Sequence, residues 1–194
     1  MSLSIEDGTG TSKRVKVTNS NRLCVSSLET TASTQAAIDG DSFNVASDIV
    51  EITDATQAAL IHIKNTSQTP WIISRVYFHF GGSTGGVGSG EFCMIGNTTE
   101  GTLISNATIQ TPVNFNIGST KTLTGNFYKG TQGSTATNGF EILNSLVPSF
   151  LGRNFITLDS VILTGGTSLT LAVIPPAGNT NLKVQVGVNF FIGE

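Results

Sequence analysis

Hydrophobic and polar residues alternate along much of this chain with the period of a β-strand. The clearest case is residues 181–192, where the apolar positions of one parity are Leu182, Val184, Val186, Val188 and Phe190. Period-two alternation places the two sets of side chains on opposite faces of a strand, and it is typical of sheets with one packed face. The pattern therefore predicts an all-β protein.

Two apolar stretches near the middle form the best-defined predicted strands. Residues 58–64 and 70–80 are rich in β-branched and aromatic side chains, and polar residues 65–69 separate them. In the second stretch one parity is apolar and the other is mixed; the two sets are Ile72, Val76, Phe78 and Phe80 against Ile73, Arg75, Tyr77 and His79. A packed face and a wetter face indicate a β-sandwich. The glycine-rich residues 81–90 end the second strand.

Similar stretches recur at short intervals, separated by Gly, Asn and Pro. The further strands predicted in the body are residues 42–45, 49–53, 91–95, 126–129, 140–147, 155–163 and 168–174, with scattered apolar positions over 101–118. Roughly ten strands spaced in this way predict an antiparallel β-sandwich, jelly-roll-like, rather than a parallel α/β fold. Residues 130–139 have no apolar anchor and are predicted to form an exposed loop.

The N-terminal residues 1–40 differ from the body, residues 41–194. Residues 1–12 are poor in apolar anchors and predict an extended arm, followed by a hairpin of residues 13–18 and 22–26. Residues 28–38 are ambiguous. Gln35-Ala36-Ala37-Ile38 could form one helical turn, but the preceding Thr and Ser residues lower helix propensity, which favours a crossing segment that ends at a turn over residues 39–41.

Charge is scarce: charged residues make up 12% of the 194 residues, hydrophobic residues make up 38%, and the net charge is −3. A neutral polar surface suits a subunit packed against copies of itself, although a secreted adhesin or a plain soluble domain could look the same. The negative charge argues against nucleic acid as the main partner. The local basic cluster Lys13, Arg14 and Lys16 is interpreted either as a protected strand edge or as a contact to an acidic partner.

The two cysteines, Cys24 and Cys93, each lie in an apolar strand pattern and are expected to be buried thiols rather than a disulfide framework. This composition favours synthesis in a reducing cytoplasm. No secretory signal or membrane-spanning apolar run is recognised, so neither Sec export nor a membrane is expected. Without a secretory signal, acceptor motifs such as Asn65-Thr66-Ser67 carry little weight.

Residues able to carry chemistry are few and scattered. His62 and His79 fall in strand patterns without the partners that a metal site or a catalytic base requires. Asp39 and Asp41, with Asp48 nearby, weakly resemble a calcium loop but lack its closing glutamate, so a plain turn is the better interpretation. The glycine run lacks the Gly-Lys-Ser/Thr ending of a phosphate loop. We therefore expect no enzyme, no cofactor and no metal.

Aromatic residues offer one alternative to a purely structural role. Trp71, Tyr77 and Tyr128 could form a platform on which a sugar stacks. The competing interpretation places Trp71, which follows Pro70 at a strand start, in the core of the sandwich, and this interpretation is preferred.

Several stretches, taken in their order along the chain, resemble small virion structural proteins of tailed bacteriophages. The resemblance does not include a catalytic motif. The stretches that carry the resemblance are residues 7–10, 14–17, 21–23, 36–44, 60–66, 81–90, 126–130 and 175–185. The resemblance implies a capsid decoration or cement protein located in the virion, with a β-sandwich body and an extended arm. It also implies the major capsid protein as partner. Self-association as a homotrimer is expected from the closed symmetries common in such assemblies. The N-terminal residues 1–40 are the expected contact region, through Ile5, Lys13, Arg14 and Lys16.

Two rival functions remain open at this point. The chain could be a tail, fibre or baseplate module that binds host glycans, through aromatics near Trp71 or through the loops at residues 81–90 and 130–139. Alternatively, it could be a carbohydrate-binding module unrelated to phage.

Overall fold

The computed structural model describes residues 31–54, 56–81, 89–101, 107–148, 153–178 and 181–193. By its contacts the chain divides into residues 1–31 and 32–194, and the elements described below all belong to the second unit. The predicted hairpin, the contact residues Ile5, Lys13, Arg14 and Lys16, and Cys24 lie outside the described residues.

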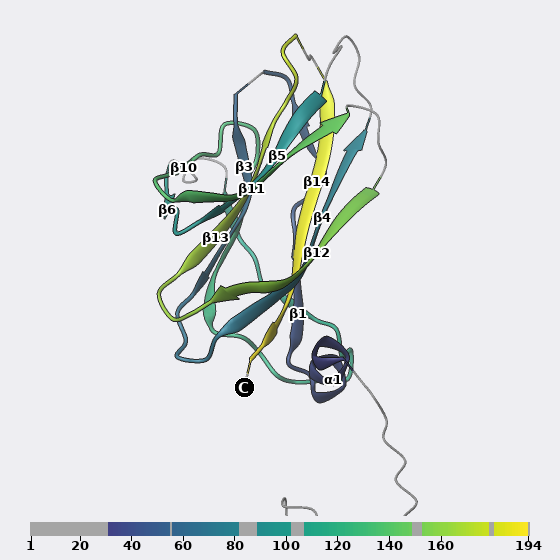
Figure 1. Ribbon diagram of the computed structural model, residues 1–194, viewed down its shortest axis with the longest axis vertical. Helices are drawn as coiled ribbons and strands as arrows, with labels where there is room; N and C mark the ends of the chain where they lie inside the picture. Colours follow the sequence, from purple (N-terminus) through teal and green to yellow (C-terminus); the bar gives the residue numbers. More distant parts are fainter. Residues whose placement is uncertain are drawn as a thin grey trace, which may run out of the picture. The chain divides into compact units, whose positions relative to one another are not determined.

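The second unit is an antiparallel β-sandwich with one short helix, as the sequence predicts (Figure 1). The elements are α1 (Ala32–Asp39), β1 (Ser42–Ala46), β2 (Val50–Ile52), β3 (Ala58–Asn65), β4 (Trp71–Gly81), β5 (Ser89–Gly96), β6 (Thr99–Glu100), β7 (Thr108–Ile109), β8 (Val113–Asn114), β9 (Gly125–Lys129), β10 (Ala136–Thr137), β11 (Phe140–Pro148), β12 (Arg153–Leu163), β13 (Ser168–Ile174) and β14 (Leu182–Ile192). The first sheet has the order β12-β4-β14-β1-β8, with β2 also paired to β14. The second sheet has the order β11-β5-β13-β3-β9-β7, and β6 pairs separately with β10.

The eight main strands pair in nested order. β1 pairs with β14, β3 with β13, β4 with β12 and β5 with β11, each time antiparallel. The first four of these strands therefore pair, in reverse order, with the last four, and the four pairs are divided between two sheets. In this arrangement β3 and β4, the two central strands of the sequence, lie in different sheets and are not partners.

The connection between β3 and β4 is organised by Asn65, which is fully buried. Its side-chain amide donates hydrogen bonds to the carbonyl oxygens of Thr69 and Leu163, both at 2.8 Å. Its side-chain oxygen accepts from the backbone N–H and the hydroxyl of Ser67, at 2.8 and 2.7 Å. The asparagine of the glycosylation acceptor motif is thus buried and has a structural role.

Strand β4 contains a bulge at Ser74. Ile73 pairs with Phe190 and Arg75 pairs with Asn189, so Ser74 is an extra residue between them. The bulge switches which parity faces the core. Burial of Val76, Phe78 and Phe80 agrees with the predicted apolar face, but before the bulge Ile73 is fully buried and Ile72 is only partly buried, opposite to prediction.

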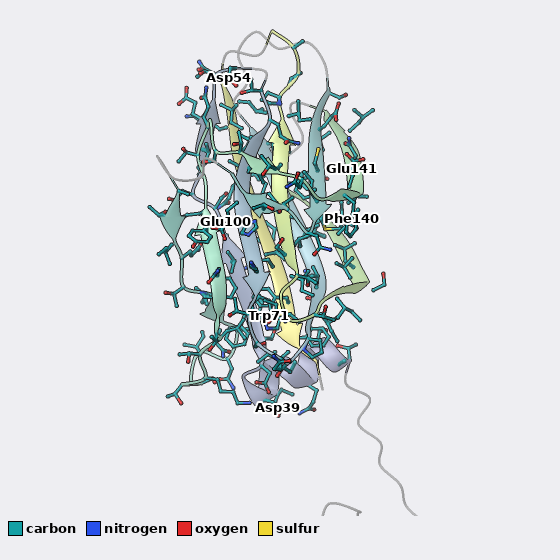
Figure 2. All side chains as sticks on the ribbon, turned by 90° about the vertical axis from the view of Figure 1, so that its left-hand side faces the viewer. Asp39, Asp54, Trp71, Glu100, Phe140 and Glu141 are labelled. Atoms are coloured by element: carbon teal, nitrogen blue, oxygen red, sulfur yellow. The ribbon has the colours of Figure 1, made fainter. Side chains whose placement is uncertain are left out.

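Trp71 packs in the core between the two sheets, with none of its side chain exposed. Its ring stacks on Phe127 of β9 and Phe190 of β14, at centroid distances of 5.4 and 5.2 Å. Figure 2 places Trp71 toward the end of the sandwich marked by Asp39, the last residue of α1. The preferred interpretation of Trp71 as a core residue is confirmed, and Trp71 is not part of a surface platform.

The segment before β1 contains a helix, α1, where a crossing segment with at most one helical turn was expected. The helix ends in a Schellman motif: the N–H of Asp41 donates to the carbonyl of Ala36 at 2.7 Å and the N–H of Gly40 donates to that of Ala37. Gly40 has a φ of +78°, which favours glycine. Ala36 is buried, and the helix packs against β1 and β14. This cap and the packing outweigh the weak helix propensity of the Thr and Ser residues.

Candidate functional site

A shallow groove of about 280 Å³ lies on the outer face of the first sheet. Its lining comes from four neighbouring strands and from the residue after β8, and consists of Asn44, Arg75, Tyr77, Phe115, Phe155 and Asn189. Aromatic, amide and guanidinium side chains are therefore gathered on one face. Arg75 and Tyr77 are the two that the sequence placed on a common mixed face.

Strand register explains how residues far apart in sequence meet in this groove. Thr157, Arg75, Asn189, Asn44 and Val113 are successive partners across β12, β4, β14, β1 and β8. In the next row that shares this face, Phe155 pairs with Tyr77 and Tyr77 pairs with Gly187. Cross-strand partners have closely spaced side chains, so pairing alone builds the groove.

Arg75 is the cation of the groove. Its guanidinium carbon lies 5.4 Å from the centre of the Phe155 ring, which is a cation–π contact. Among the carboxylates whose side chains the structure describes, none lies within ion-pair distance of Arg75. The guanidinium is exposed, so its donors face solvent beside the aromatic rings.

Asn44 and Asn189 lie in the middle of the groove and are partly buried. The Asn44 amide nitrogen donates to the Asn189 side-chain oxygen at 2.7 Å and to the Val188 carbonyl at 3.3 Å. Among the described residues, these bonds leave the Asn44 side-chain oxygen and the Asn189 amide nitrogen without a protein partner. One acceptor and two N–H donors are thereby presented side by side.

Tyr77 lies flat on the sheet because its cross-strand neighbour is glycine. A Cβ atom on Gly187 would overlap the Tyr77 ring, so the side chain occupies the space that another residue would fill. Phe115 and Phe155 complete the aromatic lining and remain 47% and 60% exposed. Large rings exposed to this degree are typical of binding surfaces.

His62, which the sequence places in a strand pattern without the partners of a metal site or a catalytic base, is buried in a polar cluster on the second sheet. Its Nδ1 lies 2.9 Å from the Thr170 hydroxyl, and that hydroxyl contacts the hydroxyl of Thr98. Its Nε2 lies 3.4 Å from a carboxylate oxygen of Glu100 on β6, without forming a hydrogen bond. The outer strand pair β6–β10 lies beside this sheet (Figure 1).

The hydroxyl, imidazole and carboxylate of this cluster are arranged in the order of a catalytic triad but lack access. Thr170 and His62 are almost completely buried, so a substrate cannot reach the hydroxyl in this conformation. Burial, with a smaller effect of the Lys64 charge, lowers the pKa of His62 to about 4. The imidazole is therefore neutral near pH 7, and the cluster acts as a buried hydrogen-bonded group in the core of the sheet. His79 is exposed on the outer face of the first sheet.

The aspartates suggested for a calcium loop have other partners. The Asp41 carboxylate pairs with Lys121 at 2.8 Å, and the Asp48 carboxylate pairs with Lys129 at 2.6 Å. Asp39 accepts hydrogen bonds from Gln35 at 3.0 Å. Across the described residues, no group of three or more His, Cys, Asp or Glu side chains is placed to hold a metal ion.

Three predicted features remain, which are Cys93, the loop at residues 130–139 and the glycine run. Cys93 is a buried free thiol whose pKa is raised to about 11, mainly by burial, so it is unreactive. The predicted surface loop at residues 130–139 contains strand β10 and a buried Ser134, whose carbonyl accepts from the N–H of Ala59 at 2.8 Å. Residues 82–88 of the glycine run lie outside the described residues.

Of the six groove residues, the sequence suggested only Tyr77 as a candidate binding residue, and it did not suggest the other five: Asn44, Arg75, Phe115, Phe155 and Asn189. Asn44 and Asn189 carry a usable signal, because asparagine is disfavoured in strands and both occupy the outward parity of strands with apolar neighbours. The two phenylalanines read as core residues in the sequence. Trp71, Tyr77 and Tyr128 do not form a common platform, because Trp71 is in the core and Tyr128 lies on the second sheet near His62, at 6.3 Å between ring centres.

No protein-family model and no curated protein sequence matches this chain. A chain from a picornavirus capsid, in work on an expanded equine rhinitis A virus particle, aligns over 100% of this chain and 87% of its own length. The sequence identity is 13% and the TM-score is 0.22, so this likeness has no weight in assigning a function. None of the described helices is long and apolar enough to cross a membrane.

Proposed function

We propose that this chain is a non-enzymatic structural subunit of a virus particle, and that it serves as a decoration or cement protein on the capsid of a tailed phage. The observation that carries the proposal is the nested pairing of the eight main strands. We infer from it a jelly roll, whose four-stranded sheets have the orders β12-β4-β14-β1 and β11-β5-β13-β3. Jelly rolls occur in viral capsid proteins and in lectins.

Assigning a capsid role to a jelly roll rests on similarity of fold alone, which limits the candidate functions but does not choose among them. The surface supplies the further support. Ten large apolar side chains of the described residues are exposed: Ile38, Ile49, Ile109, Val113, Phe115, Ile117, Phe140, Leu146, Phe155 and Ile162. Exposed apolar groups on a weakly charged surface favour repeated contacts with other subunits.

In this proposal the major capsid protein is the partner, and the chain assembles as a homotrimer with closed symmetry. Binding only to the assembled shell would stabilise that shell by mass action. The contact residues proposed from the sequence are Ile5, Lys13, Arg14 and Lys16. Catalysis has no part in the proposal, because the hydroxyl–imidazole pair of Thr170 and His62 is buried.

The test is the number of copies of this chain per particle, measured by quantitative mass spectrometry on purified virions of the genome that encodes it. A number comparable to that of the major capsid subunit is expected for a decoration protein. A number sufficient only for one or a few rings would assign the chain to the tail or fibre and overturn the cement role. Absence from particles would overturn the virion assignment altogether.

A tail, fibre or baseplate module that binds host glycans is the second candidate function. The observation that favours it is the groove of aromatic, amide and guanidinium groups on the first sheet, since lectins also use the jelly roll. The copy number separates this candidate from the first, because tail components are present in far fewer copies than shell subunits.

A further inference from the structure

We propose that the groove on the outer face of the first sheet is a binding subsite for one acidic sugar unit, a pyranose that carries a carboxylate such as a hexuronic acid or a sialic acid. In this site Arg75 binds the carboxylate, Asn44 and Asn189 bind ring hydroxyls, and the aromatic side chains contact the apolar face of the ring. The inference concerns the ligand of the groove and holds for a subunit of the shell or of the tail.

The charge of the groove suits an anionic ligand. The groove residues include one cation, Arg75, and no carboxylate. Within the described chain, the acidic groups nearest in sequence to β1, Asp41 and Asp48, are each neutralised by a lysine. An arginine without an acidic partner presents a planar set of donors that matches a carboxylate in two parallel hydrogen bonds. The Phe155 ring limits the freedom of the guanidinium, so less entropy is lost when it binds.

The side-chain amides of Asn44 and Asn189, beside Arg75, can form hydrogen bonds with the hydroxyl groups of a ligand. The hydrogen bond from Asn44 to Asn189 fixes both amides, and among the described residues it leaves the Asn44 side-chain oxygen and the two N–H donors of Asn189 without a partner. A sugar hydroxyl both donates and accepts, so a neighbouring acceptor and donor suit a pair of hydroxyls. Because the amides are already oriented, binding requires little reorganisation of the protein.

The size of the groove and the arrangement of its side chains suit a sugar better than a protein partner. The volume of about 280 Å³ lies just below the range for drug-sized ligand sites, roughly 300–1,000 Å³, and suits a single small ring. The aromatic rings lie on opposite sides of the groove, since Phe155 is on β12 and Phe115 follows β8, and two amides occupy the middle. The centre of a protein interface is usually apolar with polar groups at its rim, which is the opposite arrangement.

The experiment uses the full-length recombinant chain and titrates it with glucuronic acid and with N-acetylneuraminic acid, followed by amide chemical shifts in NMR spectra. The methyl esters of the two acids and neutral glucose are the matched ligands. We expect saturable shifts with a Kd on the order of 1 mM for at least one acid, as suits a single sugar in a shallow site. The uncharged ligands should bind at least about tenfold more weakly, because the charge-assisted pair with Arg75 is lost.

Two variants test the assignment of the residues. Arg75→Met retains most of the stem but removes the charge, and it should abolish the preference for the acid over its ester. Lys183→Met removes an exposed cation from β14 outside the groove and should leave binding unchanged. Phe155→Ala should weaken binding of acids and esters alike. Each variant is compared with the parent by its unfolding midpoint, so that loss of binding is separated from loss of fold.

Several outcomes would overturn the proposal. These are absence of saturable shifts with either acid at tens of millimolar, equal binding of acid and ester, or retention of the preference in Arg75→Met. Binding of a glutamate-rich peptide through Arg75, with no binding of the sugars, would identify the groove as a protein contact instead. None of these results bears on the copy number in particles, so failure of this inference and failure of the structural role are distinguished.

Discussion

Asn65 shows how a single polar side chain can fix the path of the chain between two sheets. Its side-chain N–H groups donate to the carbonyl oxygens of Thr69 and Leu163, and its side-chain oxygen accepts from the backbone N–H and the hydroxyl of Ser67. Removing the Asn65 side chain leaves the buried Leu163 carbonyl unsatisfied, at about 1–3 kcal/mol, and also removes the partly buried bonds to Thr69 and Ser67. We therefore expect Asn65→Ala to lower the free energy of unfolding by about 3 kcal/mol or more, measured by equilibrium denaturation in urea.

The matched control for this prediction is Asn126→Ala, because Asn126 is exposed on the neighbouring strand β9. It should change the free energy of unfolding by no more than about 0.5 kcal/mol. Similar losses in the two variants would show that the buried hydrogen bonds of Asn65 are not the cause.

His62 gives the fold a dependence on pH whose sign follows from its pKa. The pKa is lowered by burial to about 4 in the folded protein, against about 6.5 in an unfolded chain. As the pH falls from about 6.5 to 4, the unfolded state takes up a proton and the folded state does not, so stability decreases. The full effect below pH 4 is on the order of 3 kcal/mol, reduced by any attraction from Glu100.

This dependence can be measured from urea midpoints at several pH values between 7.5 and 4. The loss of stability over this interval should be smaller in His62→Gln, while His79→Gln, which alters the exposed histidine of β4, should behave like the parent. The same pH dependence in all three proteins would assign it to groups other than His62.

At this scale the sequence identifies residue environments well where they depend on local alternation. It predicts the core position of Trp71 and the shared face of Arg75 and Tyr77. It does not predict the bulge at Ser74, so it exchanges the roles of Ile72 and Ile73. Nor does it predict the burial of His62, since the threonines around it come from distant segments.

At the scale of elements, the end of α1 is set by backbone geometry as much as by contacts. Gly40 has a φ of +78°, and a Cβ atom there would overlap the Ser119 side chain. Gly178 has the similar φ of +77°, and no atom of the described residues beyond its chain neighbours lies within 4 Å of where its Cβ would be. The two glycines therefore separate the cost of the conformation from the cost of the contact.

We expect Gly178→Ala to destabilise the protein by about 1 kcal/mol, the cost of a left-handed conformation in a residue other than glycine. Gly40→Ala should cost clearly more, about 2–3 kcal/mol, because the methyl group also displaces Ser119. Urea denaturation of both variants provides the comparison. Equal losses of unfolding free energy in the two variants would mean that Ser119 moves away without measurable cost. The left-handed backbone conformation would then account for the whole effect.

Most strands could be located from the sequence because alternation is a local property, and β1, β3, β4, β5, β11, β12, β13 and β14 all appear close to their predicted positions. The partners of each strand could not be located in this way. Only five residues separate β3 from β4 in the sequence, which would allow the two strands to pair. In the structure the turn at Asn65 connects the two sheets, and β3 and β4 lie in different sheets. The candidate site follows the same rule, because the pairing of β1, β4, β12 and β14 creates it.

At the scale of the whole molecule, the nested order makes the last strand essential to the first sheet. β14 lies between β4 and β1 and also pairs with β2, so it holds three other strands. Its residues Val184, Val186, Val188 and Phe190 contribute to the core. Because most contacts join residues distant in sequence, we also expect folding to be slow for a protein of this length.

The final prediction compares the two ends of the chain. Deleting residues 182–194 removes the strand that joins β4 to β1, and this should abolish cooperative unfolding. Deleting residues 1–31 removes the other unit and leaves the 32–194 unit with all the strands and core residues described here, so its urea midpoint should be unchanged. Amide NMR spectra, which lose dispersion when packing is lost, report on both deletions independently of denaturation.

These deletions also bear on how the molecule would act in a particle. If residues 1–31 are dispensable for folding but required for attachment to capsids, their role is in assembly, as the arm hypothesis requires. A lower urea midpoint after their deletion would instead show that they stabilise the sandwich itself. Cooperative unfolding without residues 182–194 would contradict the central place of β14 and, with it, the dependence of the whole sandwich on nested pairing.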